Sequence, residues 1–97
     1  MPIRAIVELQ AKPGQRYELK RLIEGIFATH GASLPGRLGG ELYEVIEDPD
    51  MLVEIADWES AEARDAAMQN LLTADVLAPM LELMAAPFRS TVVTRPA

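Results

Sequence analysis

The fold is decided by residues 3–30, IRAIVELQAKPGQRYELKRLIEGIFATH, in which one hydrophobic period is replaced by another. Over residues 3–11 every second residue is apolar, which is typical of a half-buried β-strand. Pro13 and Gly14 end the strand, because proline cannot donate to a ladder and glycine tolerates turn geometry. Over residues 15–30 apolar residues recur at spacings of three and four, so we expect an amphipathic helix there.

A loop and a strand pair are predicted next. The loop is indicated by its glycines and proline: Gly31, Pro35, Gly36, Gly39 and Gly40. Residues 41–47 and 51–58 alternate again, and the Asp-Pro-Asp sequence at 48–50 between them is a turn signal. We therefore expect a β-hairpin.

The rest of the chain completes a recognisable order of elements. Ser60 is a suitable N-cap for a helix over residues 61–72. A second helical piece begins at Thr73, with Pro79 making its first turns irregular, and residues 88–94 indicate a last strand. The order β-α-β-β-α-β predicts an α+β, ferredoxin-like fold with an antiparallel sheet.

The sheet is expected to have two apolar faces. Apolar residues stand at both parities in the strands, as with Ile6 beside Val7 and Leu52 beside Val53. Helices on one face leave the other uncovered, so we expect a second copy of the chain to cover it. The predicted assembly is a homodimer.

Composition excludes several classes of protein. A length of 97 residues indicates one domain, residues 1–97. The net charge of −6, without a basic cluster, argues against nucleic acid and anionic membranes as partners. The chain has no cysteine, so disulfides and thiolate chemistry are excluded. We expect no signal peptide and no membrane span, and a cytoplasmic location.

Three stretches have a distinctive sequence: the strand-to-helix turn AKPG at residues 11–14, the segment LPGRLGGELY at 34–43, and DWESAEA at 57–63. In this order and spacing they resemble the antibiotic-biosynthesis-monooxygenase family. The resemblance implies a dimeric α+β barrel with a pocket between helices and sheet in each subunit. It also implies one of three activities: cofactor-free oxidation of aromatics such as anthrones to quinones, haem degradation, or none that is known.

The resemblance is incomplete at the positions that carry chemistry. Where many members have a glutamate before the tryptophan and a histidine after it, this chain has Ala56 and Ala67. The missing histidine makes the haem-degrading branch a poorer match. Where the anthrone-oxidising branch has asparagine and tyrosine, this chain has Glu54 and Arg64, so Trp58 alone is retained.

Two residues are predicted to be catalytic. Trp58 ends a strand, where its indole N–H can orient a substrate carbonyl, or the ring can simply pack that strand end onto the next helix. Glu54 shares the strand face of Trp58 by period two. On a desolvated pocket wall it would be a base for a phenolic proton, whereas at an edge or interface it would pair with Arg64 or another base.

A wider set is expected to contact the ligand. These residues are Phe27, His30, Tyr43, Arg64, Met68, Leu72, Met80 and Met84. His30 is equally suited to the carboxyl end of its helix, and the methionine stripe to an ordinary core.

The predicted function is a cofactor-independent monooxygenase that converts an electron-rich aromatic, an anthrone or hydroquinone, to a quinone. No metal or cofactor is expected. The alternatives are a non-catalytic small-molecule-binding or structural dimer and, third, a haem-binding relative using Met68 or His30. No motif supports a hydrolase or a kinase.

Overall fold

The computed structural model describes residues 1–30 and 34–96, so the predicted loop position Gly31 lies outside the described residues. The elements follow in the order β1 (Ile3–Gln10), α1 (Arg16–His30), β2 (Arg37–Glu44), β3 (Met51–Trp58), α2 (Ala61–Thr73), α3 (Ala78–Glu82) and β4 (Arg89–Val93). The second helix of the predicted β-α-β-β-α-β order is in two pieces. The α+β, ferredoxin-like prediction is confirmed.

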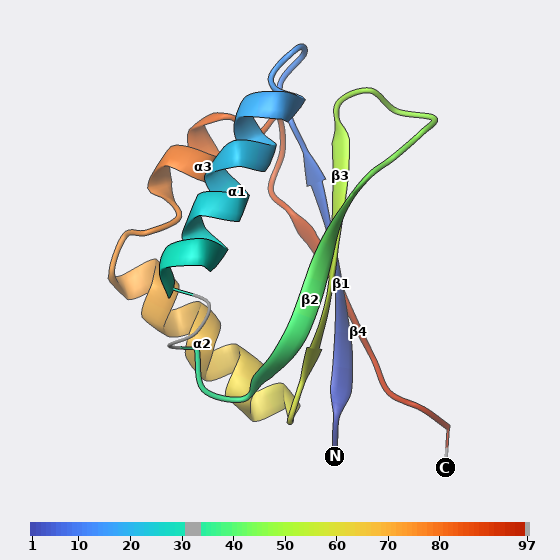
Figure 1. Cartoon of the computed structure of the whole chain (residues 1–97), viewed down its shortest axis with the longest axis vertical. Coiled ribbons are helices and arrows are strands. Elements are labelled where there is room, and N and C mark those ends of the chain that lie inside the picture. Colours follow the sequence, from blue (N-terminus) through green and yellow to red (C-terminus); the bar gives the residue numbers. More distant parts are fainter. Residues whose placement is uncertain (31–33, 97) are drawn as a thin grey trace.

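The four strands form one antiparallel sheet in the order β2-β3-β1-β4. The helices cover one face of this sheet, and the opposite face carries no helix among the described residues (Figure 1). Directly opposed residues of neighbouring strands share a face. The register sets Glu54 of β3 beside Val7 of β1 and Leu42 of β2, and Val7 and Leu42 belong to the core or pack against it. The carboxylate of Glu54 is therefore built into the helix-covered face.

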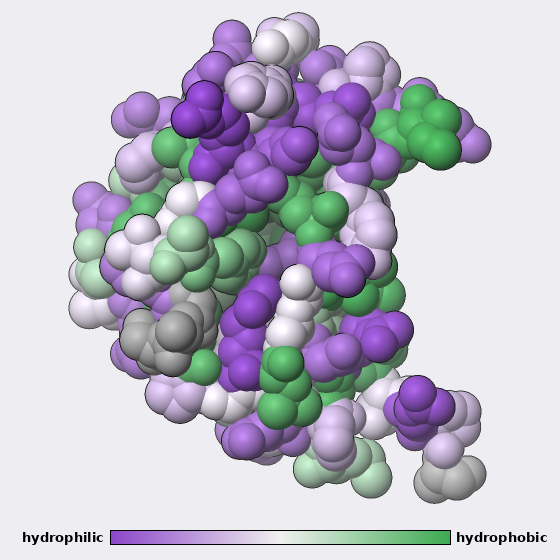
Figure 2. Space-filling view, viewed as in Figure 1, coloured by the Kyte–Doolittle hydropathy of each residue, from purple (hydrophilic) through white to green (hydrophobic). Residues whose placement is uncertain are grey.

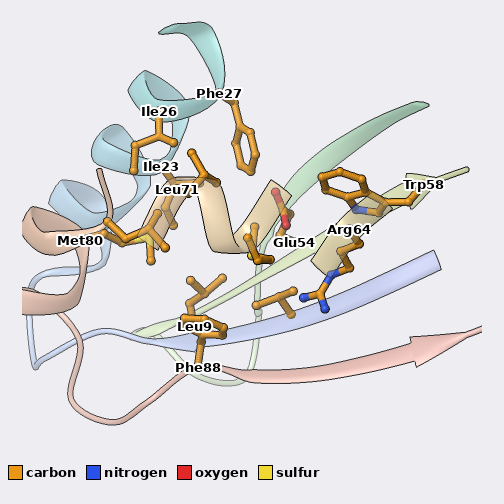
Figure 3. Close-up of a pocket in the computed structure, with 13 residues that line it drawn as sticks. Leu9, Ile23, Ile26, Phe27, Glu54, Trp58, Arg64, Leu71, Met80 and Phe88 are labelled. Atoms are coloured by element: carbon orange, nitrogen blue, oxygen red, sulfur yellow. The ribbon is translucent and has the colours of Figure 1, made fainter. Parts of the chain in front are cut away.

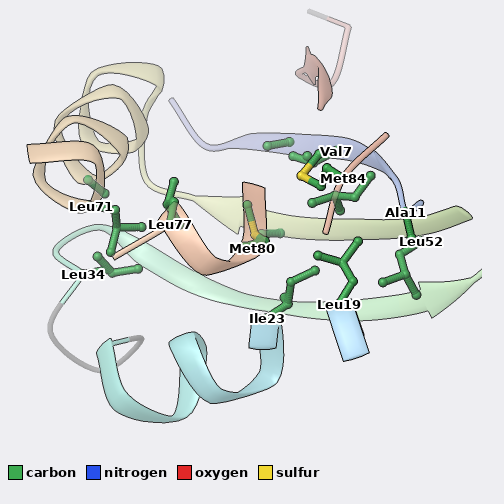
Figure 4. Packing of buried hydrophobic residues seen from close by; sticks show 14 of the residues in the cluster. Val7, Ala11, Leu19, Ile23, Leu34, Leu52, Leu71, Leu77, Met80 and Met84 are labelled. Atoms are coloured by element: carbon green, nitrogen blue, oxygen red, sulfur yellow. The ribbon is translucent and has the colours of Figure 1, made fainter. Parts of the chain in front are cut away.

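The core fills the space between sheet and helices (Figure 4). Its two largest fully buried side chains are Leu19 of α1 and Leu52 of β3, both fully shielded from solvent. Ala11 and Met84 meet in an isolated bridge at the same end of the layer, beyond the end of β1. Each buried aliphatic side chain of this size contributes about 1.5–3 kcal/mol, so this end is where the layers are held together.

Strand β2 differs from its prediction at both ends. It begins at Arg37, not at residue 41, and it ends at Glu44, leaving Ile46 fully exposed. A bulge at its start brings Arg37 opposite Trp58, while Gly39 adopts a φ of +150° that side chains with a Cβ rarely take. Gly39 and Gly40 thus belong to a bulged strand, in a segment that the sequence predicted to be a loop.

Local signals explain where the helices begin. Ser60 Oγ accepts a hydrogen bond from the Ala63 N–H at 3.1 Å, confirming the predicted N-cap of α2. The helical path breaks at Asp75, whose φ is +56°, and resumes at Ala78 instead of Thr73. Pro79 lies in the first turn of α3, where its missing N–H costs nothing. Within residues 1–30 and 34–96, no helix has the length and apolar character needed to cross a membrane.

Candidate functional site

A small cavity of about 60 Å³ lies between the helices and the sheet. Its wall is made almost entirely of apolar side chains from β1, β3 and all three helices, together with Phe88 just before β4. Glu54 and Arg64 are its two charged residues. Figure 3 shows Glu54 with Phe27 on one side and Trp58 on the other, so a carboxylate, a phenyl ring and an indole surround the same space.

A wider groove adjoins this cavity. It has a volume of about 450 Å³, runs between α1 and β2, and shares Ile23, Phe27 and Glu54 with the cavity. Figure 2 shows a depression between the two layers in which apolar residues are flanked by hydrophilic ones. Because Phe27 and Glu54 belong to both walls, they mark the place where cavity and groove meet.

Glu54 is a largely buried carboxyl group. Its side chain is 15% exposed, and burial raises the pKa of its carboxyl above the ordinary glutamate value, with the nearby charges of Arg37 and Arg64 opposing the rise. A carboxylate that burial has made more basic is suited to accepting a proton from an acidic carbon or hydroxyl. This is the chemistry expected of Glu54 from its strand face.

Arg37 is the residue that the sequence analysis missed. Its guanidinium lies 4.5 Å from the centre of the Phe27 ring, and its Nη2 is 3.9 Å from Glu54 Oε2. A Cβ at Gly40 would stand 2.6 Å from Arg37 Nη2 and 2.9 Å from the Cβ of Ala56, so the missing side chain at position 40 makes room for the guanidinium. Simple alternation back from Leu42 and Gly40 would place Leu38 on this face, and the bulge between Arg37 and Gly39 puts Arg37 there instead.

Trp58 and Arg64 close the other side of the cavity. Trp58 is 3% exposed, so its ring is both part of the core and part of the cavity wall. Arg64 Nη2 donates to Ser90 Oγ at 2.7 Å, which ties α2 to β4. The ion-pair partner of Glu54 is Arg37 and not Arg64, which acts on Glu54 only through the field of its charge.

Six of the residues predicted for the site line the cavity together: Phe27, Glu54, Trp58, Arg64, Met68 and Met80. They come from α1, β3, α2 and α3, elements far apart in the sequence. Their convergence follows from the helices lying on the face of the sheet that carries Glu54 and Trp58 (Figure 3).

Four residues predicted to contact the ligand lie outside the wall of this cavity. Tyr43 faces the opposite side of the sheet, where its hydroxyl donates to Glu41 Oε2 at 2.6 Å. Leu72 is half-exposed, and its neighbour Leu71 takes the place on the wall because of the phase of α2.

Met84 and His30 also lie outside the wall of the cavity. Met84 is buried at the far end of the layer, where it bridges Ala11. His30 is the last residue of α1 and lies outside the walls of both cavity and groove. Of the two side chains considered for haem, Met68 lines the cavity, and His30 lines neither the cavity nor the groove. Within the described ranges, no group of three or more His, Asp or Glu side chains is placed to hold a metal ion.

Comparison with known proteins shows which protein family the chain matches. Residues 2–76 match the sequence model of a family described as antibiotic biosynthesis monooxygenase. The chain belongs to this family. The predicted resemblance is thus confirmed, while no curated protein matches the chain closely enough to be counted as a relative.

Solved structures from the family and beyond share the fold. A Chloroflexus aurantiacus J-10-fl protein whose description carries the family name is 25% identical, with a TM-score of 0.74 over 100% of this chain and 97% of that one. Rv0793 from Mycobacterium tuberculosis is 23% identical, with a TM-score of 0.81 over 100% and 97% of the two chains. A mutant of SnoaB, described as a cofactor-independent oxygenase from Streptomyces nogalater, is 16% identical, with a TM-score of 0.79 over 99% and 94%.

Proposed function

We propose that this protein is a cofactor-independent monooxygenase that oxidises an electron-rich aromatic, such as an anthrone or a hydroquinone, to a quinone. The observation that carries the proposal is the position of Glu54, a mostly buried carboxylate facing an apolar cavity beside Trp58. The family supports monooxygenase chemistry, and SnoaB, which shares the fold, is described as a cofactor-independent oxygenase.

The chemistry needs a base before it needs anything else. Glu54 takes a proton from the substrate, leaving an electron-rich anion that can transfer an electron to dioxygen. Recombination forms a C–O bond to a peroxide, which takes up a proton and releases water as the carbonyl forms. For an anthrone, the ring methylene and O2 become a ketone and H2O, so every atom and electron is accounted for.

The remaining residues have supporting roles in this proposal. Trp58 orients the substrate, and the apolar side chains around it exclude water, which keeps Glu54 basic. The cavity of about 60 Å³ is smaller than the roughly 300–1,000 Å³ of usual ligand pockets. The ring system therefore lies in the groove of about 450 Å³, with its reactive edge at Glu54.

The test is dioxygen uptake by metal-stripped protein with dithranol and a panel of hydroquinones, against heat-denatured protein. Glu54→Gln removes the base and is expected to lower turnover by about 10²–10⁴-fold. Trp58→Phe is expected to reduce turnover while the fold is retained. Glu18→Gln, at an exposed carboxylate of α1 outside the walls of both cavity and groove, is the matched control. Unchanged uptake in Glu54→Gln would remove Glu54 from the mechanism.

A second candidate is a non-catalytic domain that binds a small molecule. It is favoured by the small inner cavity and by Trp58, which packs as a core residue and is 3% exposed. Co-purified ligand without oxygen uptake across the panel would support this candidate over the monooxygenase.

We propose that both candidates work as homodimers. Ile6, Val53 and Ile55 are partly exposed on the sheet face that the helices leave uncovered, and a second copy would bury them. Light scattering is expected to give twice the chain mass of 10.6 kDa. Ile55→Glu is expected to shift the mass toward the monomer, and a monomeric wild-type protein would contradict the proposal.

A further inference from the structure

Arg37 and Glu54 form an incomplete pair. The 3.9 Å between Arg37 Nη2 and Glu54 Oε2 is too long for a hydrogen bond. Among the described residues, neither Arg37 Nε nor Glu54 Oε2 has a hydrogen-bond partner, although both atoms are buried. The side chains are 14% and 15% exposed, so little of either group is solvated. A buried polar atom left unpaired destabilises the folded state, so this arrangement is unfavourable unless something completes it.

The two groups present one donor and one acceptor across a short gap. A single oxygen atom at about 2.8 Å from each group can bridge a separation of 3.9 Å. It must accept from the guanidinium and donate to the carboxylate, which a hydroxyl group does and an ether or a ketone does not. Both residues line the groove, so a ligand lying there reaches them.

The surrounding charges do not favour an anionic ligand. Glu24 of α1 lines the groove, and Arg64 of α2 adds its field from the cavity side, whereas the carboxylate of Glu41 is bonded to Tyr43 on the opposite face of the sheet. With Glu54 ionised, the carboxylates of Glu54 and Glu24 balance the guanidinium groups of Arg37 and Arg64, so an anionic ligand gains no net attraction on entry. A neutral phenol needs no such attraction. Once its proton has moved to Glu54, its negative charge lies beside Arg37.

The arrangement around Arg37 supports holding such an aromatic. The guanidinium stacks on Phe27 at 4.5 Å, and the space above Gly40 keeps it on the helix-covered face of β2. Stacking fixes the plane of the guanidinium, so its N–H donors, the unpaired Nε and the Nη2 nearest Glu54, are already oriented.

We propose that Arg37 and Glu54 together bind a phenolic hydroxyl, with Glu54 accepting its proton and Arg37 holding the resulting phenolate oxygen. The O–H bond breaks, a carboxyl O–H bond forms on Glu54, and both electrons of the broken bond stay on the phenolate oxygen. This inference rests on the proposed function, because it gives the substrate a hydroxyl next to the base. It makes Arg37 the residue that selects phenols.

The experiment uses 4-nitrophenol, whose phenolate absorbs visible light and which serves as a binding probe without oxygen chemistry. Its affinity and its ionisation when bound are measured across pH by absorbance, with 4-nitroanisole as the probe that lacks the hydroxyl. The proteins are wild type, Arg37→Met and the control Arg21→Met, which removes an exposed guanidinium of α1 that stacks on Tyr17 and not in the groove.

Wild type and Arg21→Met are expected to bind nitrophenol more tightly than nitroanisole. Arg37→Met is expected to bind nitrophenol about ten-fold more weakly and to raise the pH at which the bound phenol ionises, with nitroanisole affinity unchanged. If Arg37→Met does not fold, Arg37→Gln removes the charge while keeping an N–H donor, and the same rise in ionisation pH is expected.

Equal nitrophenol affinity and ionisation in wild type and the Arg37 variants would overturn the proposal, as would a wild type that fails to distinguish the two probes. These outcomes do not depend on oxygen uptake. Absence of uptake with the expected probe pattern would instead remove the monooxygenase function and leave the phenol site in place.

Discussion

The layer between the helices and the sheet is filled at one end and hollow at the other. At the filled end, Leu19 and Leu52 are fully buried and Ala11 bridges Met84 (Figure 4). At the hollow end, the cavity opens beside Glu54 (Figure 3). Both ends lie on the same strands, but α3 and the start of α1 cover the filled end, whereas α2 covers the hollow end (Figure 1). The difference therefore comes from the covering helices as well as from the side chains of the sheet.

The rows of residues across the sheet show how the difference arises. Next to the filled end, Leu9 is paired with Leu52: Leu52 is fully buried, while Leu9 is buried and already belongs to the wall of the cavity. At the hollow end, the corresponding rows contain Glu54 and, opposite Ala56, Gly40, which has no side chain to fill the space. The filled end buries aliphatic side chains without a void, whereas at the other end buried side chains surround a cavity that contains unpaired polar atoms, as is common where function needs them.

The largest effect is expected from truncation at the filled end. Leu52→Ala removes a side chain that is fully shielded from solvent and is expected to lower the free energy of unfolding by about 2–5 kcal/mol. Met68→Ala, at the half-buried wall of the cavity, is expected to cost less than about 2 kcal/mol, since it enlarges a space that already exists. Urea denaturation measures both, and equal losses would show that the two ends do not differ.

An intermediate effect is expected where the hollow end is roofed by α2. Ser60→Ala deletes the hydroxyl that accepts from the Ala63 N–H and is expected to cost about 1 kcal/mol. Ser60→Asp, which keeps an acceptor, is the matched control and is expected to restore most of the loss in thermal unfolding. A loss as large as that of Leu52→Ala would mean that α2 depends on its cap far more than on its packing.

The smallest effect is expected from the titration of Glu54. Burial raises its pKa above the ordinary value of 4.5, so the folded state binds more protons than the unfolded state once the pH passes that value. Stability contributed by the protonated carboxyl is therefore lost as the pH rises from 4.5 through the raised pKa of the folded protein.

The comparison with Glu54→Gln isolates this titration. Subtracting the unfolding free energy of the variant from that of wild type cancels the other titrating groups. The difference is expected to fall as the pH rises from 4.5 through the raised pKa of Glu54 in the folded protein, and then to level off. A difference that does not change with pH would show that Glu54 is not desolvated, and would weaken its role as a base.

The elements with a regular period were predictable from the sequence. Strand β1, helix α1 and strand β3 follow hydrophobic alternation or helical spacing closely, and the structure places them within a residue or two of the prediction. The start of β2 was not predictable in the same way, because Gly39 and Gly40 indicate a loop when no neighbour is known. Only pairing with β3 shows that they belong to a bulged strand.

The site residues that could be predicted from the sequence are those whose position depends only on the two-residue alternation of a strand. Glu54 and Trp58 share a face by period two, and the structure lines one cavity with both. Tyr43 was misassigned because a hydrogen-bonding aromatic carries no signal of which face of the sheet it occupies. Arg37 was missed because the bulge shifts its parity, and Leu72 was preferred to Leu71 because both fit a helical stripe over so short a segment.

The bulge in β2 determines which side chain at the start of this strand faces the groove. Arg37 is opposite Trp58 only because Leu38 is the extra residue, and Leu38 is largely exposed. The backbone that allows this is Gly39, at a φ of +150° with no atom near its absent Cβ. A branched residue at that position favours a regular strand, which turns Leu38 inward and Arg37 outward. On the wall of the groove, the guanidinium of Arg37 would then be replaced by the isobutyl group of Leu38. The backbone torsion at position 39, a residue that does not line the groove, thus sets the polarity of that wall.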